Sequence, residues 1–412
     1  MAVPKPYTLE VPQQFLDWVN VRVKTARTIP DLDHPSGGEW NDGIPTTVME
    51  ELVDYWKTQY DWRRVEKNIN DTYKMFTIDL EEDEELITLH FVHHRSKRSD
   101  AIPLIFCHGW PGNFMEAESL LKLTDPEDPT EQAFHIVAPS IPGFALSSSP
   151  KKPGSMAVTH IARLYNKLMH ALGYKNYVAQ GGDWGSFITR SLAIQFPQSC
   201  FAIHLNFAMC LAPSPLRNPL AIFYLLTRWF TPAEKENLSR VQWWMKSESG
   251  YYHIHSTKPQ TISYGLLDSP IGMLAWIREK VNALAEPDFV WEPELIITYT
   301  MLYLLSGSAS HARIYKDNIP SVSKEVMEPI MPSSVAVGVS CFPKDVGNMP
   351  KWWAECFFPN IVFWKDQEKG GHFASVEVPE RLLGDLQEWI SAVRFRGSSQ
   401  AWEALLKSGA LA

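Results

Sequence analysis

The stretch GGDWG at residues 181–185 indicates the fold of this chain, because its one acidic residue, Asp183, lies between glycines. The apolar run Tyr177–Gln180 precedes it, and the helical pattern Ser186–Phe196 follows it. A sharp strand-to-helix turn forces its central residue into a strained backbone conformation and needs small neighbours, because strand and helix nearly touch. The stretch therefore predicts that the Asp183 side chain is exposed above a sheet, at a helix N-terminus that favours an anion.

Short apolar runs alternate with amphipathic helical patterns on both sides of this turn. The predicted strands are Lys74–Leu80 and Glu85–His93, which form a hairpin, then Ile102–Cys107, His135–Pro139, Tyr177–Gln180, Phe201–Asn206, Val335–Cys341 and Asn360–Trp364. The helical patterns between or after them include Val158–Leu172, Ser186–Phe196 and Pro379–Val393. Apolar strands separated by amphipathic helices favour a parallel sheet that is covered on both faces. The fold class is therefore α/β, with a mostly parallel sheet.

The alternation of strands and helices divides the chain into four predicted segments. Residues 1–73 are an N-terminal meander that packs on core and lid, and residues 74–207 are the first part of the core. Residues 208–325, which show no clear strand, are an inserted helical lid, and residues 326–412 are the second part of the core. Within the meander, a long loop runs from Pro30 to Pro45. The stretch TVME at residues 47–50 then predicts a capping box that opens a helix to about Val65.

Composition excludes several classes of protein. The chain of 412 residues carries 38 basic and 47 acidic side chains, a net charge of −9, so no basic surface is expected for nucleic acid. Its five cysteines form no CxxC or Cys/His cluster, which argues against a disulfide framework and a zinc site. No signal pattern is found, and the apolar stretches Leu220–Phe230 and Leu295–Leu305 are shorter than the roughly 20 residues that span a bilayer. We expect a soluble, cytoplasmic protein.

A carboxylate at the turn restricts the chemistry, because the usual nucleophile at such a position is serine. If Asp183 attacked an ester as serine does, the product would be an anhydride. A carboxylate can instead displace a leaving group from saturated carbon and form an alkyl ester. The substrate would then be an epoxide or an alkyl halide. The pentapeptide alone leaves open that Asp183 only caps a helix in a glycine-rich turn.

A second turn, HGWPG at residues 108–112, directly follows the predicted strand Ile102–Cys107. Its glycines and proline favour a tight bend whose amides face the site. We predict that the backbone N–H groups of Trp110 and Trp184 form an oxyanion hole. The residues expected to shape the two turns are His108, Gly109, Pro111, Gly182 and Gly185. A proline-glycine turn without a catalytic role is the alternative.

Two further turns, FPKD at residues 342–345 and GGHF at residues 370–373, follow the last two predicted strands. They complete the chain order nucleophile, acid, histidine that this arrangement requires. We predict that His372 is the general base and that Asp345 orients it. The other acids that compete for this orienting role are Asp366, Glu368 and Glu377.

Taken together, these motifs resemble those of the epoxide hydrolases of the microsomal type, and most closely their soluble fungal members. The similarity runs from roughly residue 7 to 395. It includes WNDG at residues 40–43 and lid motifs at 250–270 and 313–316. The resemblance implies an α/β-hydrolase core, a helical lid, and neither cofactor nor metal. It also implies that Tyr251 and Tyr315 bind the epoxide oxygen and donate the proton, with the adjacent Tyr252 as an alternative to Tyr251.

The expected function is therefore the hydrolysis of an epoxide to a vicinal diol through an alkyl ester of Asp183. The aromatic residues of the lid segment favour a small apolar or aryl substrate: Phe223, Trp229, Trp243, Trp244 and Trp276. Three alternatives stay open: a haloalkane dehalogenase, a biosynthetic cyclase that opens an epoxide on the same scaffold, and a non-catalytic binding protein. We expect no nucleic acid or membrane partner, and the resemblance implies a homodimer through the lid.

Overall fold

The computed structural model describes residues 2–213, 223, 230–396 and 399–411. Its strands form one sheet of nine, in the spatial order β1-β2-β3-β5-β4-β6-β7-β8-β9. Their bounds are β1 Lys5–Pro6, β2 Met75–Glu82, β3 Glu85–His94, β4 Ile102–Cys107, β5 Phe134–Pro139, β6 Tyr177–Gly181, β7 Cys200–Leu205, β8 Ala336–Cys341 and β9 Ile361–Asp366. Each of the eight predicted strands overlaps one of them. Only the two residues of β1 were missed, because so short a strand shows no periodicity.

The sheet is antiparallel at one edge and parallel everywhere else. Strands β1, β2, β3 and β5 pair antiparallel, and every pair from β5 through β4 to β9 is parallel. Every residue of β4, β5 and β8 is buried, as expected for strands that are covered on both faces. The predicted mostly parallel α/β architecture is confirmed.

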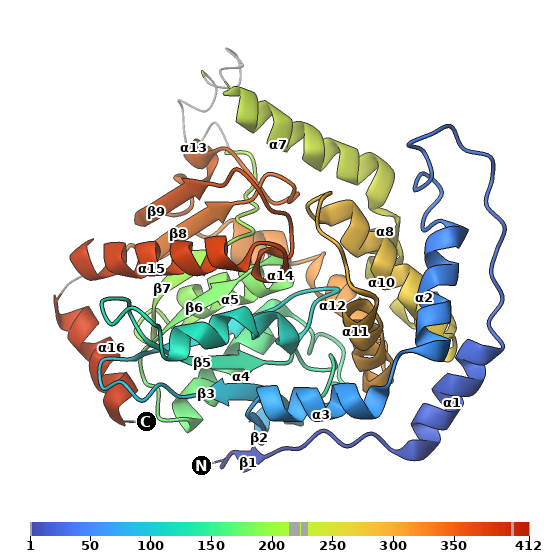
Figure 1. Cartoon of the computed structure of the whole chain (residues 1–412). Coiled ribbons are helices and arrows are strands. Elements are labelled where there is room, and N and C mark those ends of the chain that lie inside the picture. Colours follow the sequence, from blue (N-terminus) through green and yellow to red (C-terminus); the bar gives the residue numbers. More distant parts are fainter. Residues whose placement is uncertain (1, 214–222, 224–229, 397–398, 412) are drawn as a thin grey trace.

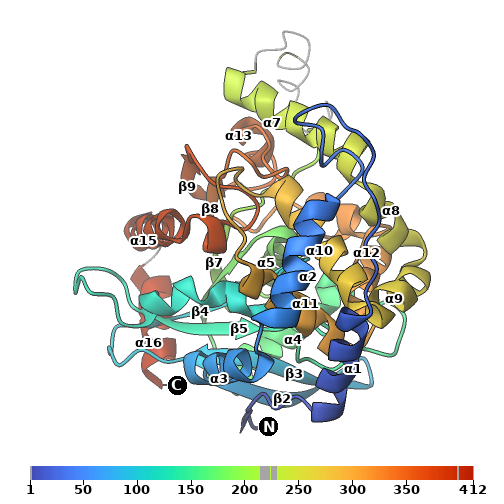
Figure 2. The same cartoon turned by 45° about the vertical axis from the view of Figure 1, so that its right-hand side comes forward.

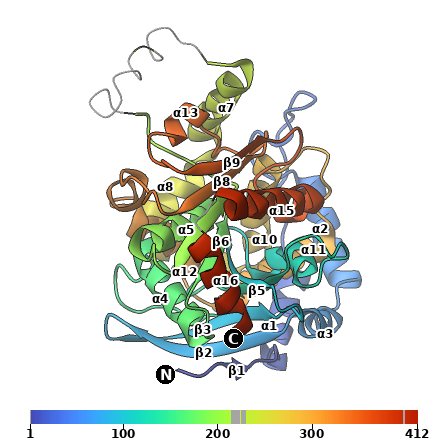
Figure 3. The same ribbon diagram turned by 90° about the vertical axis from the view of Figure 1, so that its left-hand side faces the viewer.

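Helices cover both faces of the sheet. The core helices are α4 Val158–Ala171, α5 Asp183–Gln195, α13 Lys351–Ala354, α14 Ala374–Glu377, α15 Pro379–Arg396 and α16 Ser399–Leu411, with 3₁₀ helices η1 Phe114–Ala117 and η2 Ser119–Thr124. Helix α5 packs against α4 and strand β6, whereas α15 packs against β9 and η2. Figure 3 shows α4 and α5 on one side of the sheet and α15 on the other.

A group of helices between β7 and β8 occupies the segment predicted as the lid. Its members are α7 Pro232–Trp243, α8 Gly250–Thr257, α9 Pro259–Asp268, α10 Pro270–Leu284, α11 Pro293–Ser306 and α12 Ser310–Asn318, with the short π-helical segments η3 Trp244–Glu248 and η4 Ser323–Met327. Helix α12 packs on α8, and α10 packs on α11, beside the N-terminal helices (Figures 1 and 2). Most of the apolar run at residues 220–230, including Trp229, lies outside the described residues. Within the described part of the chain, no helix is long and apolar enough to cross a membrane.

The N-terminal segment contains three helices, α1 Gln13–Lys24, α2 Thr46–Thr58 and α3 Trp62–Thr72. The prediction of one helix from Thr47 to about Val65 is therefore wrong. Helix α2 starts after Pro45, whose side chain has no acceptor for a cap, and the Thr46 N–H donates instead to the carboxylate of Asp31 at 2.9 Å. The chain then breaks, and Asp61 caps α3 by accepting hydrogen bonds from the backbone of residues 63 and 64.

Candidate active site

Asp183 begins helix α5 directly after strand β6, and its backbone adopts a φ of +50°. A non-glycine residue in this region is strained, which is typical of a nucleophile on a sharp turn. The neighbouring glycines are required by space. A Cβ atom at Gly185 would lie 1.8 Å from the carbonyl oxygen of Cys107, and one at Gly182 would lie 2.6 Å from the side chain of Asn206. Only glycine lets the helix approach the neighbouring strands this closely.

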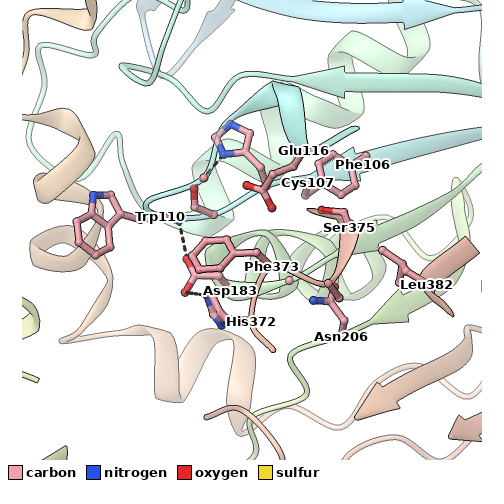
Figure 4. A pocket seen from close by; sticks show the side chains of 15 residues that line it. Phe106, Cys107, Trp110, Glu116, Asp183, Asn206, His372, Phe373, Ser375 and Leu382 are labelled. Atoms are coloured by element: carbon pink, nitrogen blue, oxygen red, sulfur yellow. Dashed lines mark hydrogen bonds and ion pairs between the residues drawn. The ribbon is translucent and has the colours of Figure 1, made fainter. Parts of the chain in front are cut away.

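The carboxylate of Asp183 lies between a backbone amide and an imidazole, as Figure 4 shows. The Trp110 N–H donates to Oδ1 at 2.7 Å, and Nε2 of His372 lies 3.4 Å from Oδ2. One of the two amides predicted for the oxyanion hole therefore already contacts the carboxylate. The amide of Trp184 stays a prediction. Oδ2 is the oxygen that faces the imidazole.

The HGWPG turn holds the Trp110 amide in place. His108 is buried, and burial lowers its pKa to about 4, so that its ring is neutral at pH 7. The ring lies 3.0 Å from the carbonyl oxygen of Gly109 through Nδ1, and Nε2 accepts a hydrogen bond from the Ile141 N–H at 3.1 Å. This network assigns the ring proton to Nδ1. A Cβ atom at Gly109 would lie 2.2 Å from Oδ1 of Asp183, so this glycine leaves room for the carboxylate.

His372 is held by the fully buried Asp345, whose Oδ1 lies 2.8 Å from Nδ1 of the imidazole. The same oxygen accepts a hydrogen bond from the Val346 N–H at 2.6 Å, which orients the carboxylate. Burial by itself would lower the pKa of His372, but the negative charges of Asp345 and Asp183 raise it well above its ordinary value. The imidazole is therefore protonated between two carboxylates at neutral pH.

The structure brings none of the three competing acids to His372. Asp366 and Glu368 are exposed. Glu377 accepts hydrogen bonds from the backbone N–H groups of Phe373 at 2.7 Å and Glu286 at 2.6 Å. Glu377 therefore supports the backbone of the loop that carries the histidine, whereas the imidazole itself meets Asp345.

Two lid tyrosines approach the site from different helices. Tyr251 lies on α8 and Tyr315 on α12, and their rings pack edge to face with centroids 5.7 Å apart. Trp110 stacks on Tyr251 at 4.8 Å, and Trp184 meets the ring of Tyr315 at 4.9 Å. The two phenols thus lie on the aromatic residues that directly adjoin the carboxylate.

The charge of Asp183 reaches both of these phenols. Burial raises the pKa of Tyr251 and that of Tyr315, and the carboxylate of Asp183 raises both further. For the adjacent Tyr252, burial alone accounts for the raised pKa. This difference favours Tyr251 over Tyr252 as the partner of Tyr315.

Two residues around the HGWPG turn were not predicted from the sequence. The Tyr303 hydroxyl donates to the carbonyl oxygen of Gly112 at 2.8 Å and so ties the turn to lid helix α11. Glu116 lies beside Asp183 and His372 in the lining of one small cavity. The pattern Asn113-x-x-Glu116 is that of a capping box and could have drawn attention to Glu116, whereas no local pattern marks Tyr303.

One group of side chains in the described part of the chain could offer three ligands to a metal ion: Glu82, Asp83 and His160. Arg163 forms ion pairs with both carboxylates, and Lys167 lies 2.6 Å from Glu82. These cations already neutralise the acidic side chains. The group is therefore an ion-pair network at the β2–β3 hairpin, apart from Asp183.

Comparison with known proteins identifies the family. A family model described as "Epoxide hydrolase N terminus" matches residues 4–117, and one described as "alpha/beta hydrolase fold" matches residues 102–240. The chain is 30% identical to Epoxide hydrolase 1 of Sus scrofa, over 94% of this chain and 88% of that protein.

Solved structures agree with this match. The structure of Aspergillus niger epoxide hydrolase is 32% identical, has a TM-score of 0.82, and aligns over 95% of this chain and 96% of that one. Juvenile hormone epoxide hydrolase from Bombyx mori is 27% identical, with a TM-score of 0.83 and 96% of both chains covered. This chain therefore belongs to the epoxide hydrolase family and has the α/β-hydrolase fold.

Proposed function

We propose that this enzyme converts a small apolar or aryl epoxide into a vicinal diol through a covalent ester of Asp183. The observation that carries the proposal is the continuous set of contacts from the Trp110 amide through Asp183 and His372 to Asp345. It supplies a nucleophile on a strained turn, an amide for a developing negative charge, and an oriented base.

In the first half-reaction, Tyr251 and Tyr315 hold the epoxide oxygen by hydrogen bonds. Oδ2 of Asp183 attacks a ring carbon, because Oδ1 is occupied by the Trp110 amide. A new carbon–oxygen bond forms as the ring carbon–oxygen bond breaks, and a phenol donates its proton to the alkoxide. The raised pKa keeps both phenols protonated at pH 7, and an alkoxide is a strong enough base to take a proton from a phenol. The attack also removes the negative charge of Asp183, which is one of the causes of the raised pKa.

Formation of the ester prepares His372 for the second half-reaction. The ester carries no negative charge, so one of the two carboxylates that raise the pKa of His372 is lost. The imidazolium then releases its proton, and the phenolate left by the first step takes one up, so that the net charge of the site is unchanged. His372 is now neutral and can act as a base.

Water then hydrolyses the ester. His372 takes one proton from a water molecule whose oxygen attacks Cγ of Asp183, and the amides of Trp110 and Trp184 bind the resulting oxyanion. The bond between Cγ and Oδ2, the ester oxygen that is attached to the substrate carbon, breaks, and the second proton of the water ends on that departing oxygen. The diol leaves, and the cycle closes with Asp183 anionic and His372 protonated.

Isotope labelling tests this route. In a single turnover in ¹⁸O-water with enzyme in excess, we expect the label in the carboxylate of Asp183 and unlabelled oxygen in the diol, because water attacks the protein carbon. Label in the diol from the first turnover would contradict the ester route. A panel of aryl, aliphatic and terpenoid epoxides with chiral product analysis, run beside bromoalkanes, separates diol formation from bromide release and from cyclised products.

Removal of either phenol tests the assignment of the proton donors. Tyr251→Phe and Tyr315→Phe should each lower kcat/KM by about 10- to 100-fold, and the double variant by on the order of 10³-fold or more, because general acid catalysis contributes on that scale. Tyr252→Phe is the matched control and should stay within about threefold. A loss in Tyr252→Phe equal to that in Tyr251→Phe would reverse the choice between the two neighbours.

The two charge states of Asp183 predict a change in the pKa of His372. In the free enzyme this pKa is raised by two carboxylates, and in the alkyl-enzyme by one. Ester hydrolysis needs neutral His372, so its rate should fall by about tenfold for each pH unit below the pKa of His372 in the alkyl-enzyme. This pKa should be lower than the pKa of His372 in the free enzyme. Rapid-mixing measurements of ester decay, compared with an NMR titration of His372 in the free protein, check this. Equal pKa values in the two states would contradict it.

A further inference from the structure

A cavity of about 20 Å³ lies between the Asp183 turn and the His372 loop. Its lining includes Asp183, His372, Glu116, Ser375 and Asn206, and Figure 4 shows the carboxyl group of Glu116 directed toward the same space as Asp183. A water molecule needs about 10–15 Å³ of such space and two to four polar partners. The cavity therefore has room for one water molecule and none for an epoxide.

Glu116 is fixed at the wall of this cavity. It lies in 3₁₀ helix η1, where Oε1 accepts a hydrogen bond from the Asn113 N–H at 3.1 Å in a capping box. The side chain presses against the HGWPG turn, since a Cβ atom at Gly112 would lie 1.6 Å from Oε1. Protein surrounds the carboxyl group, yet the residue keeps some accessible surface. The enclosed carboxyl group and the remaining accessible surface of Glu116 are consistent with each other if that surface faces the cavity.

Burial raises the pKa of Glu116 to about 8, although the positive charge of His372 opposes the shift. The side chain is therefore mostly protonated and uncharged at pH 7. A neutral acid offers a carbonyl oxygen to a water molecule without adding a third negative charge beside His372. A third carboxylate would raise the pKa of His372 further, so that less of the imidazole would be neutral and able to act as a base.

We propose that Glu116 is a positioning residue that holds the hydrolytic water of this enzyme in the cavity, against His372. The water donates one hydrogen to Nε2 of His372 and the other to the carboxyl oxygen of Glu116. Its oxygen is then directed at Cγ of Asp183, which lines the same space. The inference rests on the proposed ester route, because the water is needed only in the second half-reaction.

Replacement of Glu116 should separate the two half-reactions. In Glu116→Leu, which loses the acceptor, we expect alkylation within about threefold of the parent enzyme and hydrolysis of the ester slowed on the order of 100-fold. In Glu116→Gln, which resembles the neutral acid and keeps an oxygen acceptor, hydrolysis should stay within about tenfold. Intact-mass spectrometry after rapid quenching of an aryl epoxide reaction measures both rates.

The matched control is Glu118→Gln. Glu118 lies two residues along the same segment, accepts a hydrogen bond from the Tyr73 hydroxyl at 2.9 Å, and does not line the cavity. Both half-reactions should be unchanged in this variant. If Glu116→Leu slows both halves equally, the role of Glu116 is structural and the proposal is overturned. Unchanged hydrolysis in Glu116→Leu would overturn it too.

A pH profile keeps the test decisive if the leucine variant does not fold. The groups that interact with Glu116 are His372, Asp183, the hydroxyl of Ser375 and, from helix α11, the phenols of Tyr299 and Tyr303, whose pKa values burial raises well above 10. Helix α14, which packs against η1, also carries Glu377, whose pKa burial raises to about 7, and a decline caused by Glu377 would persist in Glu116→Gln.

In the free enzyme the pKa of Glu116 is about 8, and the positive charge of His372 lowers it more than the negative charge of Asp183 raises it. Both charges are absent in the ester, so Glu116 should lose its proton above pH 8 there. Ester hydrolysis in the parent enzyme should therefore slow as the pH rises above about 8, and Glu116→Gln should abolish this decline.

Two failures can be told apart. A decline that persists unchanged in Glu116→Gln overturns the role of Glu116 alone. If no ester of Asp183 forms under any condition, including in His372→Gln, both the ester route and this proposal are wrong.

Discussion

Asp183→Asn should lower epoxide turnover by at least about 10⁴-fold, because it removes the charge and the nucleophilic oxygen while it keeps the shape of the side chain. Asparagine is a better replacement than alanine here. The backbone of residue 183 has a φ of +50°, a conformation that asparagine adopts more readily than most residues. The variant should therefore fold like the parent enzyme. Diol formation under steady-state conditions measures the loss, and peptide mass spectrometry shows that residue 183 is still asparagine.

Asp366→Asn is the control for this experiment. Asp366 ends strand β9, close in sequence to His372, but its side chain is exposed and the imidazole bonds to Asp345 instead. Its activity should stay within about twofold of the parent enzyme, as for most surface substitutions. If Asp183→Asn kept turnover within tenfold of the parent, Asp183 would not be the nucleophile.

The second large effect is expected in His372→Gln, where the two half-reactions should come apart. Asp183 keeps its contact with the Trp110 amide and can still attack the epoxide, but no base activates the water. Ester hydrolysis should slow by on the order of 10³-fold or more. The intact protein should then gain the mass of one substrate molecule, and peptide mapping should place the adduct on residue 183.

A surface histidine supplies the control for the trapping experiment. His253 lies on lid helix α8, two residues from Tyr251, and its side chain is exposed. His253→Gln should turn over normally and accumulate no adduct. Multiple turnovers by His372→Gln without loss of rate, or an adduct on another residue, would show that His372 is not the base of the second half-reaction.

Local patterns in the chain were sufficient for the sheet and for the turns that follow its strands. Strand β4, for example, is buried along its whole length, so it appears as a continuous apolar run. The helix predicted from Thr47 to Val65 was wrong because the chain breaks between α2 and α3, where Asp61 caps the second helix. That signal is local and lies inside the predicted helix. The start of α2 depends instead on Asp31, fifteen residues before Thr46, which accepts a hydrogen bond from the Thr46 N–H, and such a contact leaves no trace in a local pattern.

The choice of His372's partner among four acids shows the same limit. The position of Asp345 after a strand predicted it as the partner, but Asp366, Glu368 and Glu377 lie in the same part of the core and stayed open as competitors. The tertiary structure buries Asp345 against Nδ1 of the imidazole at 2.8 Å, exposes two of the others, and gives Glu377 two backbone amides instead. Burial and direction of a side chain depend on packing between elements.

The sequence by itself determined the class of sheet, the turn that carries Asp183 and the order of the residues that follow the strands, because these depend on neighbours along the chain. Only the tertiary structure excluded the three acids that competed with Asp345, and only it showed that Glu116 shares a cavity of about 20 Å³ with Asp183. Residues 116, 183 and 372 meet because the segments that follow β4, β6 and β9 all leave the sheet at the carboxyl ends of its parallel strands. The pKa of each group then follows from burial and from charges that the folded chain brings beside it.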